Sequence, residues 1–123
     1  MHNRTYGTVS PDRLKEMSGL EFVKGLISGA LPLNTIAQTL GYDVVEAESG
    51  RVAITLEPTG AHLNPWGTVH GGLTATLLDS SMGLAIQSTL EKGAGKYDAR
   101  IQDFARQSNN ARDGSDQGRG QTP

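Results

Sequence analysis

The sequence predicts a small α+β domain in which an antiparallel sheet packs on one long helix. Two patterns lead to this class. Residues 42–48 and 51–57 favour extended structure, and the second segment alternates apolar and polar side chains. Residues 74–90 carry apolar or small side chains nearly all the way round a helix, which is typical of a helix buried on every side. Two strands cannot enclose such a helix, so we expect further strands after Leu90.

The composition suits one domain with a small-molecule or self partner. A chain of 123 residues is long enough for one core. Its 11 Lys and Arg against 13 Asp and Glu predict no basic surface for nucleic acid or an anionic membrane. The sequence has no cysteine for disulfides or thiolate metal sites. With no apolar stretch near the roughly 20 residues of a membrane span and no signal peptide, we expect a cytoplasmic protein.

Two helices are predicted near the N-terminus. Ser10 before Pro11 has the pattern of an N-cap followed by a proline in the first turn. Ser18 and Glu21 have the spacing of a capping box. The apolar residues that follow fall on one helical face, namely Leu20, Val23, Leu26 and Ile27. Gly29 ends this helix, and residues 36–41 lead toward the first strand.

The two extended segments predict an antiparallel hairpin. Ser49 and Gly50 supply the tight turn between them. Val52, Ile54 and Leu56 alternate with polar or small residues, which predicts one buried face.

A loop rich in Gly, Asn, Pro and His, residues 60–72, then leads into the long helix. Its segment His62-Leu-Asn-Pro-Trp-Gly-Thr-Val-His-Gly-Gly72, followed after six residues by Asp79, resembles the signature of the phenylacetate-pathway (PaaI-like) hotdog-fold thioesterases. The resemblance implies a hotdog fold, a curved antiparallel sheet around a central helix, which is incomplete in this chain. It also implies an acyl-CoA substrate, no cofactor, and assembly as a homodimer or a dimer of dimers.

The residue types suit thioester hydrolysis, which needs an activated water or nucleophile and a group that stabilises charge on the carbonyl oxygen. Gly71 lies where the loop becomes the helix, so its backbone N–H has no partner within the helix and could bind an oxyanion. Gly72 has no Cβ to obstruct a thioester. Asp79 lies about two turns into an apolar helix, where we expect it to be buried. It could act as a general base on water or as a nucleophile.

The resemblance assigns further roles in the loop. Asn64 would orient the water or the thioester carbonyl, and His70 would hydrogen-bond the loop or the thioester oxygen. His62, Trp66 and Gly72 would contact the substrate. In the family the Asn and Gly face the Asp of the opposite subunit, so each site spans the dimer interface.

Simpler interpretations compete with these roles. Asn64 beside a proline is commonly a turn former, and Trp66 is more often a packing residue than a stacking platform. His62 and His70 lack a third ligand, so no metal site is expected. Two other functions stay open: a hotdog hydratase or dehydratase acting on acyl thioesters, and a non-catalytic acyl-binding or dimerisation module.

The sequence divides into three parts: an N-terminal segment at 1–18, a partial hotdog domain at 19–95, and a divergent tail at 96–123 with the composition of a disordered segment. Family members continue instead with a strand resembling T-T-L-E-x-K-I-x-F-x-R-P. Without covering strands the long helix would expose its apolar surface, at about 1.5 to 3 kcal/mol for each large side chain. We therefore expect little activity from the chain as it stands.

We predict a one-base shift in the gene near Gly95, relative to its relatives. Read one base later from Lys96, degenerate back-translation permits S-T-T-L-E-F-K-I, which is close to the family strand. The step from Asp98 into Ala99 allows only Thr or Met, and the step from Asp103 into Phe104 allows only Ile or Thr. Reading the DNA around this codon tests the prediction, which is wrong if no family-like sequence follows in the next frame.

Overall fold

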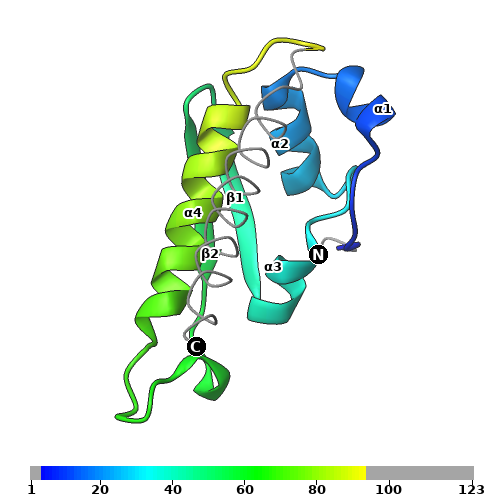
Figure 1. Ribbon diagram of the computed structural model, residues 1–123. Helices are drawn as coiled ribbons and strands as arrows, with labels where there is room; N and C mark the ends of the chain where they lie inside the picture. The colour runs from blue at the N-terminus through cyan, green and yellow to red at the C-terminus, as the bar shows by residue number, and fades with distance from the viewer. Residues whose placement is uncertain (1–3, 94–123) are drawn as a thin grey trace, which may run out of the picture.

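The computed structural model describes residues 4–93, which form an α+β arrangement (Figure 1). Along the chain its elements are α1 (Pro11–Lys15), α2 (Gly19–Ser28), α3 (Thr35–Leu40), β1 (Tyr42–Glu48), β2 (Arg51–Leu56), the 3-10 helix η1 (Gly60–His62) and α4 (Gly71–Gln87). β1 and β2 pair antiparallel, and α4 lies along the hairpin. The α+β class is confirmed and is compatible with a partial hotdog fold. The predicted later strands and the tail at 96–123 lie outside the described residues.

Both predicted helix starts are confirmed by hydrogen bonds. The Ser10 hydroxyl accepts from the Arg13 backbone N–H at 3.3 Å, and the Ser18 hydroxyl accepts from the Glu21 backbone N–H at 3.1 Å. Each cap satisfies an amide that the first helical turn leaves without a partner. Gly29 ends α2 in the left-handed conformation, with φ of 85°.

α3 was not predicted, because residues 36–41 were expected to lead directly into the strand. Asn34 occupies its N-cap position but makes no capping hydrogen bond. The Asn34 side chain instead donates from Nδ2 to the Tyr42 hydroxyl at 2.9 Å. A helix of 6 residues whose flanking asparagine bonds elsewhere has little local signal in the sequence.

The predicted hairpin is confirmed, with Tyr42 opposite Leu56 and Glu48 opposite Arg51. Gly50 in the turn has φ of 84°, a conformation that side chains with a Cβ disfavour. A bulge between Val44 and Glu46 shifts the register. Before the bulge, Tyr42 and Val44 are both buried in the core.

The core lies between α2, β1 and the segment that joins them. Its buried members are Val23, Leu26, Leu31, Leu33, Ala37, Tyr42 and Val44. All of these side chains come from the first half of the chain, and they bury α2 on the hairpin.

The expectation that the long helix is buried on every side is wrong for the described part of the chain. α4 begins three residues before the predicted position 74 and ends at Gln87. Leu73 is its one buried apolar side chain, whereas Leu78, Met82 and Ile86 are 54%, 59% and 47% exposed. Two strands cover only one side of a helix, which explains this exposed stripe.

Within residues 4–93 no helix combines the length and apolar character needed to cross a membrane.

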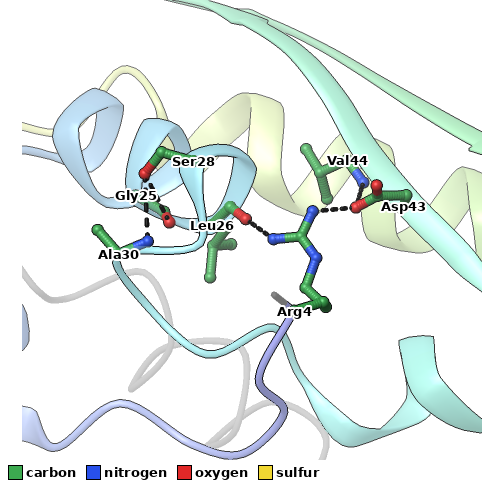
Figure 2. Close-up of polar contacts among 7 residues, drawn as sticks. All are labelled: Arg4, Gly25, Leu26, Ser28, Ala30, Asp43 and Val44. Atoms are coloured by element: carbon green, nitrogen blue, oxygen red, sulfur yellow. Dashed lines mark hydrogen bonds and ion pairs between the residues drawn. The ribbon is translucent and has the colours of Figure 1, made fainter. Parts of the chain in front are cut away.

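Residues 4–10, which we call the strap, are fixed to the body of the domain. Arg4 donates to the Leu26 carbonyl of α2 and forms an ion pair with Asp43 of β1 (Figure 2). Backbone hydrogen bonds of 2.9 Å join Gly7 N–H to the Leu33 carbonyl and Leu33 N–H to the Thr5 carbonyl. The Arg4 side chain is only 12% exposed, so this ion pair is better shielded than a typical surface pair.

We expect Gly19→Ala to destabilise the fold by about 1 to 3 kcal/mol or more, because the added methyl group would overpack a rigid contact. A Cβ at position 19 would lie 1.6 Å from the Gln87 carbonyl oxygen. The Gly19 N–H also donates to the Leu90 carbonyl at 2.9 Å, so neither backbone can withdraw without breaking a bond. Urea denaturation followed by circular dichroism measures the effect.

The matched control is Gly60→Ala, because a Cβ at position 60 has no neighbour within 4 Å. Equal unfolding midpoints for the two variants would contradict the predicted clash.

Candidate functional site

Asn64 organises the loop before α4. Its side-chain Oδ1 accepts from the backbone N–H groups of Trp66 and Thr68 at 3.0 and 3.2 Å, and its Nδ2 donates to the Thr68 hydroxyl at 2.6 Å. Its backbone N–H donates to the Thr68 carbonyl at 2.8 Å. Asn64 is therefore the turn former that its place before a proline suggests. An amide nitrogen has two hydrogens, and the second has no acceptor within residues 4–93, which leaves one donor for a ligand.

His62 is built into the fold. The imidazole is 9% exposed, and its Nδ1 accepts from the Thr59 backbone N–H at 2.9 Å. Nε2 then carries the proton and donates to the Leu40 carbonyl at 2.7 Å. Both ring nitrogens are thus bound to backbone groups. His62 thus joins η1 to the end of α3, and its predicted contact with the substrate stays a prediction.

His70 caps α4. Its Nδ1 accepts from the Gly72 backbone N–H at 2.8 Å, and its own backbone N–H donates to the His62 carbonyl at 2.8 Å. Because Nδ1 accepts, the neutral ring carries its proton on Nε2. The side chain is exposed, so this Nε2–H is available at the surface.

The space around Gly71 differs from the space around Gly72. A Cβ at position 72 would lie 2.9 Å from Nδ1 of His70, so this glycine makes room for the capping ring. A Cβ at position 71 would meet no atom within 4 Å. Within residues 4–93 the Gly71 N–H has no acceptor, and it lies at the positive end of the α4 dipole. Of the two amides, that of Gly71 is the one left to bind an oxyanion.

Asp79 is exposed, contrary to the burial expected from the sequence. It is eight residues beyond Gly71, which corresponds to about 12 Å along a helix axis. One chain therefore does not bring its own Asp79 to its own Gly71 amide.

Four of the candidate residues line two separate hollows in the described part of the chain, whereas Asn64, Trp66 and Gly71 line neither. Asp79 lines a cavity of about 410 Å³ together with residues of the strap, α2 and β1. His62, His70 and Gly72 line a second hollow of about 260 Å³ next to the start of α4.

Trp66 does not pack on the described part of the chain, because it is 84% exposed. Leu63 and Val69, which form an isolated antiparallel bridge, are 44% and 41% exposed. The simpler interpretation of Trp66 as a loop-packing residue is therefore wrong for residues 4–93. These three side chains form an apolar loop tip.

A hydrogen-bonded group beside Asp79 was missed in the sequence. Asn34 Nδ2 donates to the Tyr42 hydroxyl at 2.9 Å, and that hydroxyl shares a 3.2 Å hydrogen bond with the Ser80 hydroxyl. Tyr42 is only 2% exposed, and a buried phenol usually has a hydrogen-bond partner. An inward-facing tyrosine in the first strand was the available signal, but the sequence does not identify partners 8 and 38 residues away.

Within residues 4–93 no three His, Cys, Asp or Glu side chains cluster as metal ligands.

We expect His70→Ala to destabilise the chain by about 0.5 to 2 kcal/mol, because it removes the acceptor for the Gly72 amide. His70→Asn should recover most of this loss, since asparagine is a good N-cap residue. Urea denaturation of the three chains measures the difference. If the Ala and Asn variants were equally destabilised, the capping role would be wrong.

Comparison with known proteins relates part of the chain to a thioesterase. Over 51 residues it is 43% identical to acyl-coenzyme A thioesterase 13 of Homo sapiens and, to the same extent, to that of Pongo abelii. The match covers 42% of this chain and 36% of each of those proteins, so it spans about a third of the relatives' length. No protein-family model matches the chain, and no solved structure matches it. The chain is thus a partial homologue of acyl-coenzyme A thioesterase 13.

Proposed function

We propose that the protein is an acyl-CoA thioesterase of the PaaI-like type, which hydrolyses an acyl-coenzyme A to the free acid and coenzyme A. The observation that carries this proposal is the 43% identity over 51 residues to acyl-coenzyme A thioesterase 13. The chemistry of the described residues supports it. An exposed helix-terminal amide at Gly71 and a carboxylate at Asp79 are the two kinds of group that the reaction requires.

The active site would be shared between two copies of the chain. A general base must lie within about 2.6 to 3.2 Å of the water it activates. In one chain the Gly71 amide and Asp79 are about 12 Å apart along α4. A two-fold symmetric pair solves this problem, because each copy can offer its Asp79 to the Gly71, Asn64 and His70 of the other. The exposure of Asp79 and Gly71 fits such a pairing.

In the general-base route, the Asp79 carboxylate takes a proton from water as the water oxygen attacks the thioester carbonyl carbon. The oxyanion that forms accepts a hydrogen bond from Gly71 N–H of the other copy. When the intermediate collapses, the carbon–sulfur bond breaks, and the leaving thiolate takes the proton from Asp79. The products are a carboxylic acid and the coenzyme A thiol.

In the nucleophilic route, the Asp79 carboxylate attacks the carbonyl carbon itself and expels the thiolate. Water then hydrolyses the mixed anhydride, which regenerates the Asp79 carboxylate, releases the carboxylic acid and supplies the proton that the thiolate takes up. In both routes the second Nδ2 hydrogen of Asn64 and the Nε2–H of His70 are the further donors for the carbonyl oxygen or the water. Trp66 would contact the substrate from the loop tip.

We predict that Asp79→Asn lowers the release of coenzyme A thiol by about 10² to 10⁴-fold, because an amide cannot accept the proton or attack the carbonyl. A thiol-reactive dye measures release from acyl-CoAs with aliphatic and aromatic acyl groups. Asp12→Asn, in the exposed first turn of α1, is the control and should leave the rate unchanged. Undiminished hydrolysis by Asp79→Asn would overturn the assignment. A hydratase would consume an enoyl-CoA without releasing thiol, and a non-catalytic module would bind acyl-CoA with no turnover.

A mixing experiment tests the shared site within the same assay. Asn64→Asp removes the Nδ2 donor and keeps the Oδ1 acceptor that holds the turn, so this variant should fold. If the site is shared, mixing inactive Asp79→Asn and Asn64→Asp chains restores about a quarter of the wild-type rate per chain, because half of the pairs are mixed and each has one intact site. A site within one chain would recover nothing.

A further inference from the structure

We propose that the cavity beside Asp79 binds the acyl group of the substrate, and that Val9 and Phe22 set the length of acyl chain it accepts. We call this hollow the acyl cavity. Its volume of about 410 Å³ lies within the range of about 300 to 1,000 Å³ that small-molecule sites occupy. The inference rests on the proposed function, because it takes the thioester carbon to lie next to Asp79.

The lining favours an apolar ligand. Hydrophobic side chains reach the cavity from the strap, α1, α2 and α4, among them Val9, Leu14, Phe22, Leu26 and Leu84. Burying an apolar chain against such a wall removes it from water, which is the main source of affinity for an acyl group.

The charge of the lining indicates which end of an acyl-CoA enters the cavity. Among the described residues that line the acyl cavity, Asp79 is the one charged residue, and none is Lys or Arg. The phosphates of coenzyme A need cationic or amide donors, and beside a carboxylate they would be repelled. The acyl end therefore enters the cavity, and the coenzyme A end stays outside it.

Three of the polar side chains in the wall are paired with one another. Asn34 donates to the Tyr42 hydroxyl, which bonds to the Ser80 hydroxyl. A hydrocarbon chain can therefore lie against these three side chains without taking a hydrogen-bond partner from them. A buried donor without a partner would destabilise the complex. These bonds also connect β1 to the turn of α4 that carries Asp79, so they fix the wall where the thioester would lie.

The strap supplies the wall that faces α2 and α4. Gly7, Thr8 and Val9 line the cavity, and Arg4 ties the strap to α2 and β1 through its contacts with Leu26 and Asp43 (Figure 2). Because this wall is fixed, a larger side chain at position 9 should reduce the cavity, and a smaller one at position 22 should enlarge it.

The test is the binding of a series of S-alkyl-coenzyme A thioethers of increasing chain length, which cannot be hydrolysed, measured by isothermal titration calorimetry on the full chain. Val9→Phe should weaken the longest ligands by about tenfold relative to the shortest. Phe22→Ala should move the preferred length upward, and Phe22→Leu should do so to a smaller extent if the Ala variant does not fold. Ile36→Ala is the control, because Ile36 is 45% exposed on α3 and outside the cavity.

The proposed role of the acyl cavity is wrong if the wild-type chain and the Val9 and Phe22 variants prefer the same ligand length. It is also wrong if binding does not depend on the length of the alkyl chain. The thiol-release assay of Asp79→Asn decides separately on the catalytic role. If Asp79→Asn stays active while the Val9 and Phe22 variants shift the length preference, the catalytic role of Asp79 is wrong and the acyl cavity stands. If Asp79→Asn is inactive while those variants leave the length preference unchanged, the catalytic role stands and the acyl cavity is wrong.

Discussion

The hydrogen bonds of His70 determine where α4 begins, and the positions of the other candidate groups follow from that start. Its ring accepts from the Gly72 amide and its backbone N–H donates to the His62 carbonyl, so the helix starts at Gly71. The Gly71 amide is thereby left at the positive end of the helix. From the same start, the rise of about 1.5 Å per residue places Asp79 about 12 Å along the axis, beside the acyl cavity. The regular geometry of one helix therefore separates the amide from the carboxylate, which is the reason for proposing a site shared between two copies.

Those parts of the fold that depend on near neighbours in the chain could be predicted from the sequence. The serine caps of α1 and α2 bond amides three residues away, and the turn at Gly50 needs only its own backbone conformation. α3 was missed because the Asn34 side chain bonds Tyr42 of the next strand instead of capping the helix. The exposure of α4 was missed for a similar reason, since burial depends on how many strands cover a helix and the described part of the chain supplies two.

The same division applies to the candidate site. The sequence identifies the residue types that suit thioester chemistry, but it does not say which hydrogen bonds they already make. Asn64 and His62 hold the loop through their side chains, and Gly72 gives room to a histidine ring. The Tyr42–Ser80 hydrogen bond joins residues 38 apart and was not accessible from any local pattern. The chemistry that remains for a substrate is therefore narrower than the motif suggests: the Gly71 amide, one amide hydrogen of Asn64, Nε2–H of His70 and the Asp79 carboxylate.

The exposed loop tip has a practical consequence for spectroscopy. Trp66 is the single tryptophan of the chain and is 84% exposed, whereas the tyrosines contribute little to emission excited at the red edge of the indole band. The fluorescence of this chain thus reports on one location, a few residues from the start of α4. An indole surrounded by water emits at longer wavelength than a covered one. A second subunit or a nucleotide that binds over the loop would therefore shift the emission to shorter wavelength, and no attached dye is needed to detect it.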